Sequence, residues 1–427
     1  YQTLGESSIV GNSIFDEMQS NNLSKDDKSN IGLDLDYKYH LSDNSSLSIN
    51  GHYTNYDYSR NQTVFNSYFL NNSFNETTAF KTLADQDTDI FTSKIDFNSA
   101  LGAHSEFELG AKLSLVNTNS GINHYDIISG LEVLNTQNTN VFDYEEQVYA
   151  GYLNYNYSKE KVSLTFGLRA EQTNIEGLSV NEINTQDYLK WFPNASFNYD
   201  VSDNFSAYVN YKKSIQRPNY SNLNPFIFYL NDNNIVTGNP DLKPVIIDHY
   251  LVGTTLFEKF TIEAYYKTYS DNIFELPIQD NNTNIISYTP LNIKKTTEIG
   301  IDFETYFDIT EKWFLYFGSS TFNYKDEGII NDSKINRDKW SNYSILSNDF
   351  SFLKDKSLTA NLTLVYISDN VQGYRVVESR FISDLSVRKT IFKGKGVVSL
   401  AVSDLFNKQD FTSVTKLPNI GQDNKLF

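Results

Sequence analysis

Long stretches of this chain alternate strictly between apolar and polar residues. In residues 31–41 the odd positions are apolar or aromatic, and the even positions carry Gly, Asp, Lys or His. A repeat of two residues is the period of a β-strand, whose successive side chains point to opposite faces. Residues 162–171 and 298–308 show the same alternation. The chain is therefore predicted to be all-β, built from strands with one apolar face and one polar face.

The connections between the predicted strands also alternate, between short turns and long polar loops. The short turns are predicted at residues 42–45, 102–105, 158–161, 202–204, 258–259, 310–312, 354–356 and 393–395. The long loops are predicted at residues 61–87, 119–140, 176–186, 216–244, 273–291, 326–336 and 369–374. The strands between them would run for about 10–14 residues, longer than the usual strand of a soluble protein. Antiparallel neighbours joined in this way form an up-and-down sheet with two unlike ends.

A sheet of this size is predicted to close into a transmembrane barrel. We count about seventeen strands, and an open sheet that wide would leave unpaired edges, which are costly in lipid. The chain has 30 Tyr and 30 Phe but only 39% hydrophobic residues, which suits strands that face lipid on one side and water on the other. The aromatic residues Trp191, Phe192, Trp313 and Trp340 are predicted to belong to girdles at the membrane interfaces. The predicted architecture is a large antiparallel up-and-down transmembrane β-barrel with short periplasmic turns and long extracellular loops.

Composition and missing motifs exclude several functional classes. The net charge of −18 argues against binding to a nucleic-acid backbone. The chain has no cysteine, no apolar run long enough for a transmembrane helix, and no nucleotide-binding or hydrolase motif. We expect no metal, no cofactor and no enzymatic activity. The histidines show no metal-binding spacing and are interpreted as structural or solvated: His40, His52, His104, His124 and His249.

A series of short motifs resembles the TonB-dependent receptors, most closely the Bacteroidetes-type outer-membrane β-barrel domain of that superfamily. The motifs are FGLRAE at 166–171, WFP at 191–193, SIQRP at 214–218, LNPF at 223–226, GNPDLKP at 238–244 and VSDLFN at 402–407. They follow the order of the family along nearly the whole chain. The resemblance implies a structural role for these motif residues: Arg169, Glu171, Arg217, Pro218, Asn224, Pro225, Gly238, Asn239, Pro240, Leu242 and Pro244.

The resemblance also implies the organisation of the complete protein. Receptors of this superfamily have a 22-stranded barrel occluded by an N-terminal plug domain. A short segment on the plug side pairs with TonB by strand addition. Residues 1–427 are therefore expected to be a partial outer-membrane β-barrel domain, with the plug and the final strand outside this sequence. The expected location is the outer membrane of a Gram-negative bacterium. The expected partners are outer-membrane lipid or lipopolysaccharide, TonB through the plug region, and a surface lipoprotein.

The implied function is that of a receptor that binds a ligand in its extracellular loops and lumen for energised uptake. Iron chelates, glycans and peptides are the substrate classes considered. Recognition is expected in the long loops, at residues 61–87, 119–140, 216–244 and 273–291. Aromatic residues of one loop are candidates for stacking on a sugar or an aromatic chelate, although packing of the loop itself explains them at least as well: Tyr220, Phe226, Phe228 and Tyr229.

The sequence leaves two other interpretations open. The first is an outer-membrane barrel without transport, acting as a structural or interaction component of a surface complex. The second is a secreted β-protein that binds glycans, whose apolar faces would pack on each other across a dry interior. A continuous lipid-facing band around the barrel would exclude the second interpretation.

Overall fold

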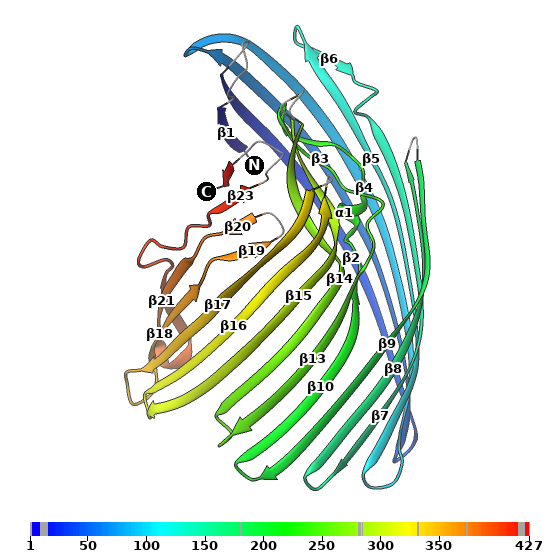
Figure 1. Ribbon diagram of the computed structural model, residues 1–427, viewed down its shortest axis with the longest axis vertical. Helices are drawn as coiled ribbons and strands as arrows, with labels where there is room; N and C mark the ends of the chain where they lie inside the picture. Colours follow the sequence, from blue (N-terminus) through cyan, green and yellow to red (C-terminus); the bar gives the residue numbers. More distant parts are fainter. Residues whose placement is uncertain are drawn as a thin grey trace.

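The computed structural model describes residues 2–8, 16–179, 182–280, 283, 285–330, 333–372, 375–416 and 423–426. Most of this part of the chain lies in β-strands that run side by side in one curved wall (Figure 1). Successive strands of the wall pair antiparallel, as β2 with β3, β3 with β4, and β4 with β5. The prediction of an all-β, antiparallel, up-and-down sheet is confirmed.

The main sheet has 20 strands in the described part of the chain. The wall consists, in order, of β1 (Gln2–Ser8), β2 (Glu17–Ser42), β3 (Ser45–Leu70), β4 (Ser73–Ala100), β5 (Ser105–Ile128), β7 (Asn140–Lys159), β8 (Val162–Ser179), β9 (Glu182–Ser202), β10 (Phe205–Gln216), β13 (Val245–Leu256), β14 (Phe260–Asp280), β15 (Ile285–Thr310), β16 (Trp313–Ile330), β17 (Ser333–Ser351), β18 (Leu358–Ile367), β21 (Arg380–Ile391) and β22 (Gly396–Val402). Three short strands branch from the wall: β6 (Leu131–Leu134), β11 (Phe228–Asn231) and β12 (Asn234–Val236).

The wall curves around a lumen and has two edges in the described residues. β2 pairs with β1 through residues 17–23, and its remaining residues pair with β3 alone. β22 forms the other edge and pairs with β21. Within the described ranges, no strand pairing joins β22 to β1 or β2. The order along the wall is that of an outer-membrane barrel.

The strands are much longer than the sequence pattern predicts. β2 and β3 span 26 residues each, and β4 spans 28. Residues 61–87, 119–140 and 273–291, which were predicted as loops, lie largely in paired strands, as do residues 176–186 and 326–336. The loop prediction is wrong there because backbone hydrogen bonds continue the ladder into polar sequence, where the alternation of side chains disappears.

The predicted short turns are confirmed, and they lie together at the lower end of the wall in Figure 1. Each connects two neighbouring strands through a few residues, as between β2 and β3 or between β9 and β10. Several turn residues, among them Glu160, Glu258 and Lys393, have a positive φ. The long hairpins lie toward the other end of the wall, and so does the connection between β10 and β13 (Figure 1). The wall therefore has the two unlike ends that the sequence indicates.

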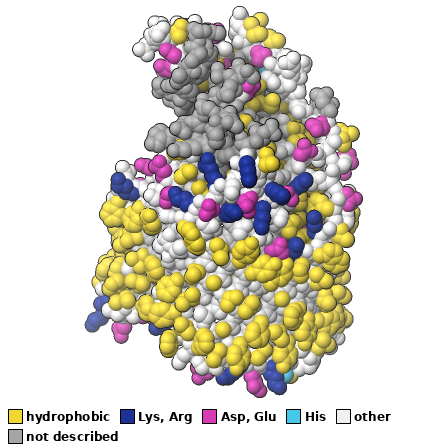
Figure 2. Space-filling view, in the orientation of Figure 1, with side chains coloured by type: hydrophobic (Ala, Val, Ile, Leu, Met, Phe, Trp, Pro, Cys, Tyr) yellow, Lys and Arg dark blue, Asp and Glu magenta, His cyan; other side chains and the backbone are white. Residues whose placement is uncertain are grey.

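Apolar side chains cover the outer face of the wall. Residues that alternation assigned to lipid are exposed, with Leu35 at 70% and Ile301 at 57%. Figure 2 shows these side chains as a broad belt in the lower half of the molecule, with a row of Lys, Arg, Asp and Glu directly above it. A belt below a charged row matches a hydrocarbon layer below lipid headgroups. The apolar faces do not pack across a dry interior, so the secreted glycan-binding interpretation is wrong.

Two of the residues predicted for the aromatic girdle face outward, and one does not. Trp191 and Trp340 are 54% and 62% exposed. Phe192 is only 5% exposed, because the residue after an outward Trp191 on the same strand points into the lumen. On β9, Trp191 therefore faces outward and Phe192 faces the lumen.

A second, small sheet lies beside the end of the wall. It has four strands: β19 (Asn370–Gln372), β20 (Arg375–Val377), β23 (Ser413–Lys416) and β24 (Asp423–Leu426). β23 pairs with β20 and β24, and none of the four joins the wall in the described residues. The residues that follow β22 thus contribute two strands of this small sheet, β23 and β24, and the connection between β18 and β21 contributes the other two.

Candidate ligand-binding site

The connection between β10 and β13, residues 217–244, folds inward instead of ending as a hairpin, and we name it the strap. Proline has no N–H for a ladder, so Pro218 marks where the pairing of β10 stops. One helical turn, α1 (Tyr220–Leu223), and the hairpin β11–β12 follow. Gln216 still pairs with Val245, on either side of the strap. The strap is thus an excursion from one continuous ladder.

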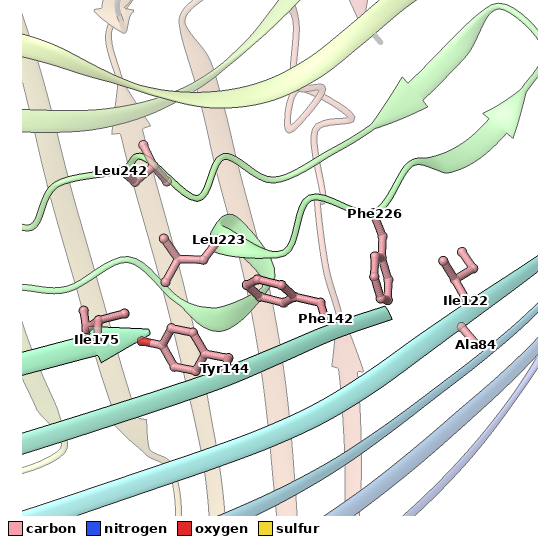
Figure 3. Packing of buried hydrophobic residues seen from close by; sticks show 8 residues of the cluster. All are labelled: Ala84, Ile122, Phe142, Tyr144, Ile175, Leu223, Phe226 and Leu242. Atoms are coloured by element: carbon pink, nitrogen blue, oxygen red, sulfur yellow. The ribbon is translucent and has the colours of Figure 1, made fainter. Parts of the chain in front are cut away.

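Three strap residues form an apolar cluster with the wall (Figure 3). Leu223, Phe226 and Leu242 are 3%, 1% and 1% exposed. The wall contributes residues of β4, β5, β7 and β8: Ala84, Ile122, Phe142, Tyr144 and Ile175. Full burial of one such apolar side chain is worth about 1.5–3 kcal/mol, so the cluster holds the strap firmly against the wall.

The cluster lies on the lumen side of the wall. On β5, Leu109 is 54% exposed on the outer face, while Ile122 is an odd number of residues away and points to the opposite face. On β7, Tyr149 is 46% exposed and Phe142 is likewise an odd number of residues away. The strap therefore occupies the lumen.

Polar contacts tie the strap to two distant parts of the wall. On β3, Gln62 Nε2 donates to the Tyr229 carbonyl at 3.2 Å, and the Tyr68 hydroxyl donates to Asp232 Oδ2 at 2.5 Å. On β15, residues 286–288 pair in parallel with β12. Since many strands separate β3 from β15 along the wall, the strap crosses the lumen between them.

The Gly-Asn-Pro motif joins the two halves of the strap. Gly238 N donates to the Asn224 carbonyl at 2.9 Å, and Asn239 N donates to the Asn222 carbonyl at 2.6 Å. A Cβ atom at Gly238 would lie 2.3 Å from the Asn224 oxygen, so this close approach requires glycine. The side chain of Asn224, which is buried, accepts from Phe226 N at 2.9 Å. The LNPF and GNPDLKP motifs thus meet where two backbone segments of the strap cross in direct contact.

Glu171 anchors the first residue of the strap to the wall. This carboxylate is 6% exposed on the inner face of β8. Arg169 Nε donates to its Oε1 at 2.5 Å, and Arg217 Nη2 donates to its Oε2 at 2.7 Å. Arg217, the first strap residue, also donates to Thr173 Oγ1 at 2.8 Å. Two charged partners supply the compensation that a buried carboxylate needs, so three residues from two separate motifs meet here.

The four aromatic candidates for ligand stacking do not form one open surface. Phe226 is fully buried in the cluster, and Phe228 packs against it. Tyr220 lies 5.8 Å from Phe142 between ring centroids, and its hydroxyl is 2.5 Å from the Ser120 hydroxyl. Tyr229 lines a cavity. Three of the four pack the strap, and a role in ligand stacking stays a prediction.

The cavity has a volume of about 550 Å³ and lies between the strap and the extracellular ends of β4 and β5. Its lining includes Phe80, His124, Asp126, Tyr229 and Asp232. His124 is 3% exposed and stacks on Phe80 with 5.0 Å between ring centroids. Tyr229 meets both rings edge-on, at 5.6 and 5.2 Å. Burial lowers the pKa of His124 below its usual value, so the ring is neutral at pH 7.

No motif in the sequence indicates this cavity. His124 was interpreted as structural or solvated, and its burial agrees with the structural interpretation. Asp126 and Asp232 carry no motif, and the lining comes from segments more than 100 residues apart, such as His124 and Tyr229. Alternation in β5 does place His124 and Asp126 on the lumen face, and this is the one signal that the sequence offered.

Two features are absent from the residues that the structure describes. No group of three or more His, Cys, Asp or Glu side chains is arranged there to hold a metal ion. No helix there is long and apolar enough to cross a membrane.

The rolled antiparallel wall, its apolar outer belt and its polar lumen define an outer-membrane β-barrel protein. Residues 37–425 match the outer membrane protein beta-barrel family, and the chain belongs to that family. A search of curated proteins finds no match.

Solved structures with the same fold are outer-membrane receptors. The ferripyoverdine receptor of Pseudomonas aeruginosa aligns over 99% of this chain and 68% of its own, with 13% identity and a TM-score of 0.52. The siderophore receptor PiuA from Acinetobacter baumannii aligns over 99% and 77%, with 14% identity and a TM-score of 0.55. The ferric-catecholate import receptor Fiu from E. coli K12 aligns over 96% and 75%, with 11% identity and a TM-score of 0.54. This chain thus spans about two thirds to three quarters of their lengths. These neighbours are receptors and not enzymes, as the sequence predicts for this chain.

Proposed function

We propose that this chain is the barrel of a TonB-dependent outer-membrane receptor that binds a ligand at the extracellular end of its lumen for uptake. The strap is the observation that carries the proposal. A passive pore needs an unobstructed lumen, whereas a receptor needs a surface that holds its ligand before release. The strap crosses the lumen and, with β4 and β5, lines a cavity of ligand size.

The neighbours support transport without identifying the ligand. One is bound to ferripyoverdine, another is described as a copper transporter, and a third is in complex with a hemophore and heme. These cargoes all contain a transition metal but differ in the group that carries it, and the identities of 10–13% carry only the fold. The substrate class therefore has to come from residues of this chain.

We further propose that lipopolysaccharide is the lipid that surrounds the barrel. Lys295, Lys325 and Lys334 lie around Glu327 on β15–β17, with Lys325 Nζ 2.9 Å from Glu327 Oε1. A hydrogen bond from Lys325, followed by the charges of Lys295 and Lys334, lowers the pKa of Glu327. These three lysines outnumber the two nearby carboxylates, Glu327 and Asp338, the latter opposite Lys325 in the ladder. A local excess of lysine charge suits the phosphate groups of the outer leaflet.

Uptake by the complete protein in its own cells tests the proposal. Cells with and without the protein are compared for accumulation of ferric chelates, oligosaccharides and peptides, each in the presence and absence of TonB. We expect accumulation of one class that requires both the protein and TonB. Loss of the protein without any change in TonB-dependent accumulation would contradict transport and favour the alternative, a non-transporting component of a surface complex. Co-purification of a lipoprotein would identify its partner.

A further inference from the structure

The ionisable groups that line the cavity between the strap and β4–β5 are acidic or neutral, and no lysine or arginine among the described residues lines it. The side chain of Asp126 is 44% exposed, and its Oδ2 accepts from Asn135 Nδ2 at 3.0 Å. Asp232 accepts the hydroxyls of Tyr68 and Thr78 on the same oxygen, Oδ2. Each carboxylate has two oxygens with several acceptor sites, so both retain capacity for further donors.

His124 adds to this acceptor character. Its Nε2 lies 3.4 Å from Asp126 Oδ1, and its Nδ1 is buried without a partner among the described residues. A neutral imidazole that directs Nε2–H toward the carboxylate leaves Nδ1 as an acceptor. The histidine is therefore an uncharged neighbour of the two carboxylates and does not cancel their charge.

Aromatic rings form the other part of the lining. The ring of Tyr229, half-buried, stands edge-on to Phe80 and His124, at 5.6 and 5.2 Å between centroids. Faces of such rings attract cations within about 6 Å, and the attraction is stronger where water is displaced. Carboxylates beside aromatic rings thus favour a positively charged group on a flat or apolar body.

We propose that this cavity binds an organic cation, whose amidinium, guanidinium or ammonium group lies between Asp126 and Asp232 and against the ring of Tyr229. The inference rests on the proposed function as a receptor and specifies its substrate class. Two other classes fit less well. An anionic ligand would meet two carboxylates with no basic residue to offset them. A bare metal ion would need donors that converge, and in the described residues no such group exists.

Three small probes of nearly the same shape test the inference on the full chain in detergent. Benzamidine is cationic, benzamide is neutral and benzoate is anionic at pH 7. Their affinities are measured by saturation-transfer NMR titration. We expect benzamidine to bind at least tenfold more tightly than benzamide, and benzoate to bind more weakly than both. Equal affinities for the three probes, or no binding of benzamidine, would overturn the inference.

Variants locate the binding. The double variant Asp126→Asn with Asp232→Asn should lower the affinity for benzamidine at least tenfold and leave that for benzamide unchanged. The matched control is Glu132→Gln, which removes a carboxylate on β6 that pairs with Lys81 at 2.9 Å and lies outside the lining. An equal loss in the control would assign the effect to general surface charge. If the double variant fails to show the heat-dependent gel mobility of a folded barrel, Asp126→Asn alone and Tyr229→Leu replace it, with the same expected direction.

The test of the cation site and the test of transport can fail independently of each other. Failure of benzamidine binding together with TonB-dependent uptake of an uncharged or anionic compound would refute the cation site and leave the receptor. Charge-selective binding at Asp126 and Asp232 without any TonB-dependent uptake would refute transport and leave the site.

Discussion

The hydroxyl of Tyr208 on β10 donates a hydrogen bond to Glu263 on β14 at 2.6 Å, across the strand that lies between them. That strand, β13, presents Gly253 at the same level, since Gly253 pairs with both Tyr208 and Glu263. The missing side chain leaves a slot in which the phenol ring lies over the backbone. The tyrosine thereby links three consecutive strands on the lumen face.

The same arrangement recurs elsewhere in the wall. Tyr152 on β7 pairs with Gly110 on β5, Gly110 pairs with Asp96 on β4, and the Tyr152 hydroxyl donates to Asp96. A Cβ at Gly110 would lie 2.2 Å from the Tyr152 ring. Two separate triples of tyrosine, glycine and carboxylate indicate a repeated device that stiffens the wall where it faces water.

We predict that Gly253→Ala destabilises the barrel. The new Cβ would lie 2.3 Å from the Tyr208 ring, so the ring must move and lose its bond to Glu263. The expected cost is about 1–3 kcal/mol of unfolding free energy, measured by urea unfolding in detergent micelles.

The control is Gly151→Ala on β7, where nothing lies within 4 Å of the new Cβ. It should change the unfolding free energy by less than about 0.5 kcal/mol. If both variants behave alike, the slot has no energetic role. Tyr208→Phe should reproduce the part of the loss that comes from the hydrogen bond.

We predict that Gly238→Ala releases the strap without unfolding the wall. A Cβ there meets backbone oxygens of Asn224 at 2.3 Å and Asn222 at 2.8 Å, which cannot move like a side chain. Limited proteolysis should cut within residues 217–244 in the variant while gel mobility still reports a folded barrel. Gly51→Ala, with open space around its Cβ, is the matched control and should stay resistant. Unchanged resistance in Gly238→Ala would contradict the role of the motif.

We predict a larger cost for Glu171→Gln. The change leaves Arg169 and Arg217 without their shared carboxylate, in a position that is nearly buried. Breaking such a buried pair costs about 3–5 kcal/mol. Thermal unfolding is the measurement, and Glu176→Gln, at an exposed position of the same strand, is the control and should shift stability by less than about 0.5 kcal/mol. A small effect of Glu171→Gln would show that water, and not the arginine pair, solvates the carboxylate.

We predict a contribution to acid sensitivity from Asp26 on β2, which precedes the alternating apolar stretch 31–41. Hydrogen bonds from Arg60 Nε and Nη2, at 2.8 and 2.9 Å, lower its pKa from 3.8 to about 2. Because the folded pKa lies below the unfolded value, the stabilisation is present above about pH 4 and is lost as the pH falls toward 2. Melting temperatures between pH 5 and pH 2 should fall less steeply in Asp26→Asn. At pH 7 the partly exposed Asp26–Arg60 pair should contribute less than about 1 kcal/mol to the free energy of unfolding. Parallel pH profiles of the variant and the parent would contradict this assignment.

Alternation of residues was sufficient to predict the class of fold and which face each strand turns to lipid. Leu33, Leu35, Ile299 and Ile301 were assigned to the outer face and are exposed there. The turns were predictable because short charged segments interrupt the alternation. The lengths of the strands were not, since polar hairpins such as residues 61–87 pair through their backbones and leave no pattern in the side chains.

What the sequence determined by itself is therefore local: a period of two, the turn positions, and motif residues whose chemistry demands proximity. What only the tertiary structure decided is which distant residues meet. Glu171 and Arg217 were both named from motifs, yet their contact depends on strands β8, β9 and β10 lying side by side. The cavity of His124, Asp126 and Asp232 depends on the strap crossing the lumen between β3 and β15. A strand specifies the face of each side chain through its own geometry, but it carries no information on what a chain segment 100 residues away brings to that face.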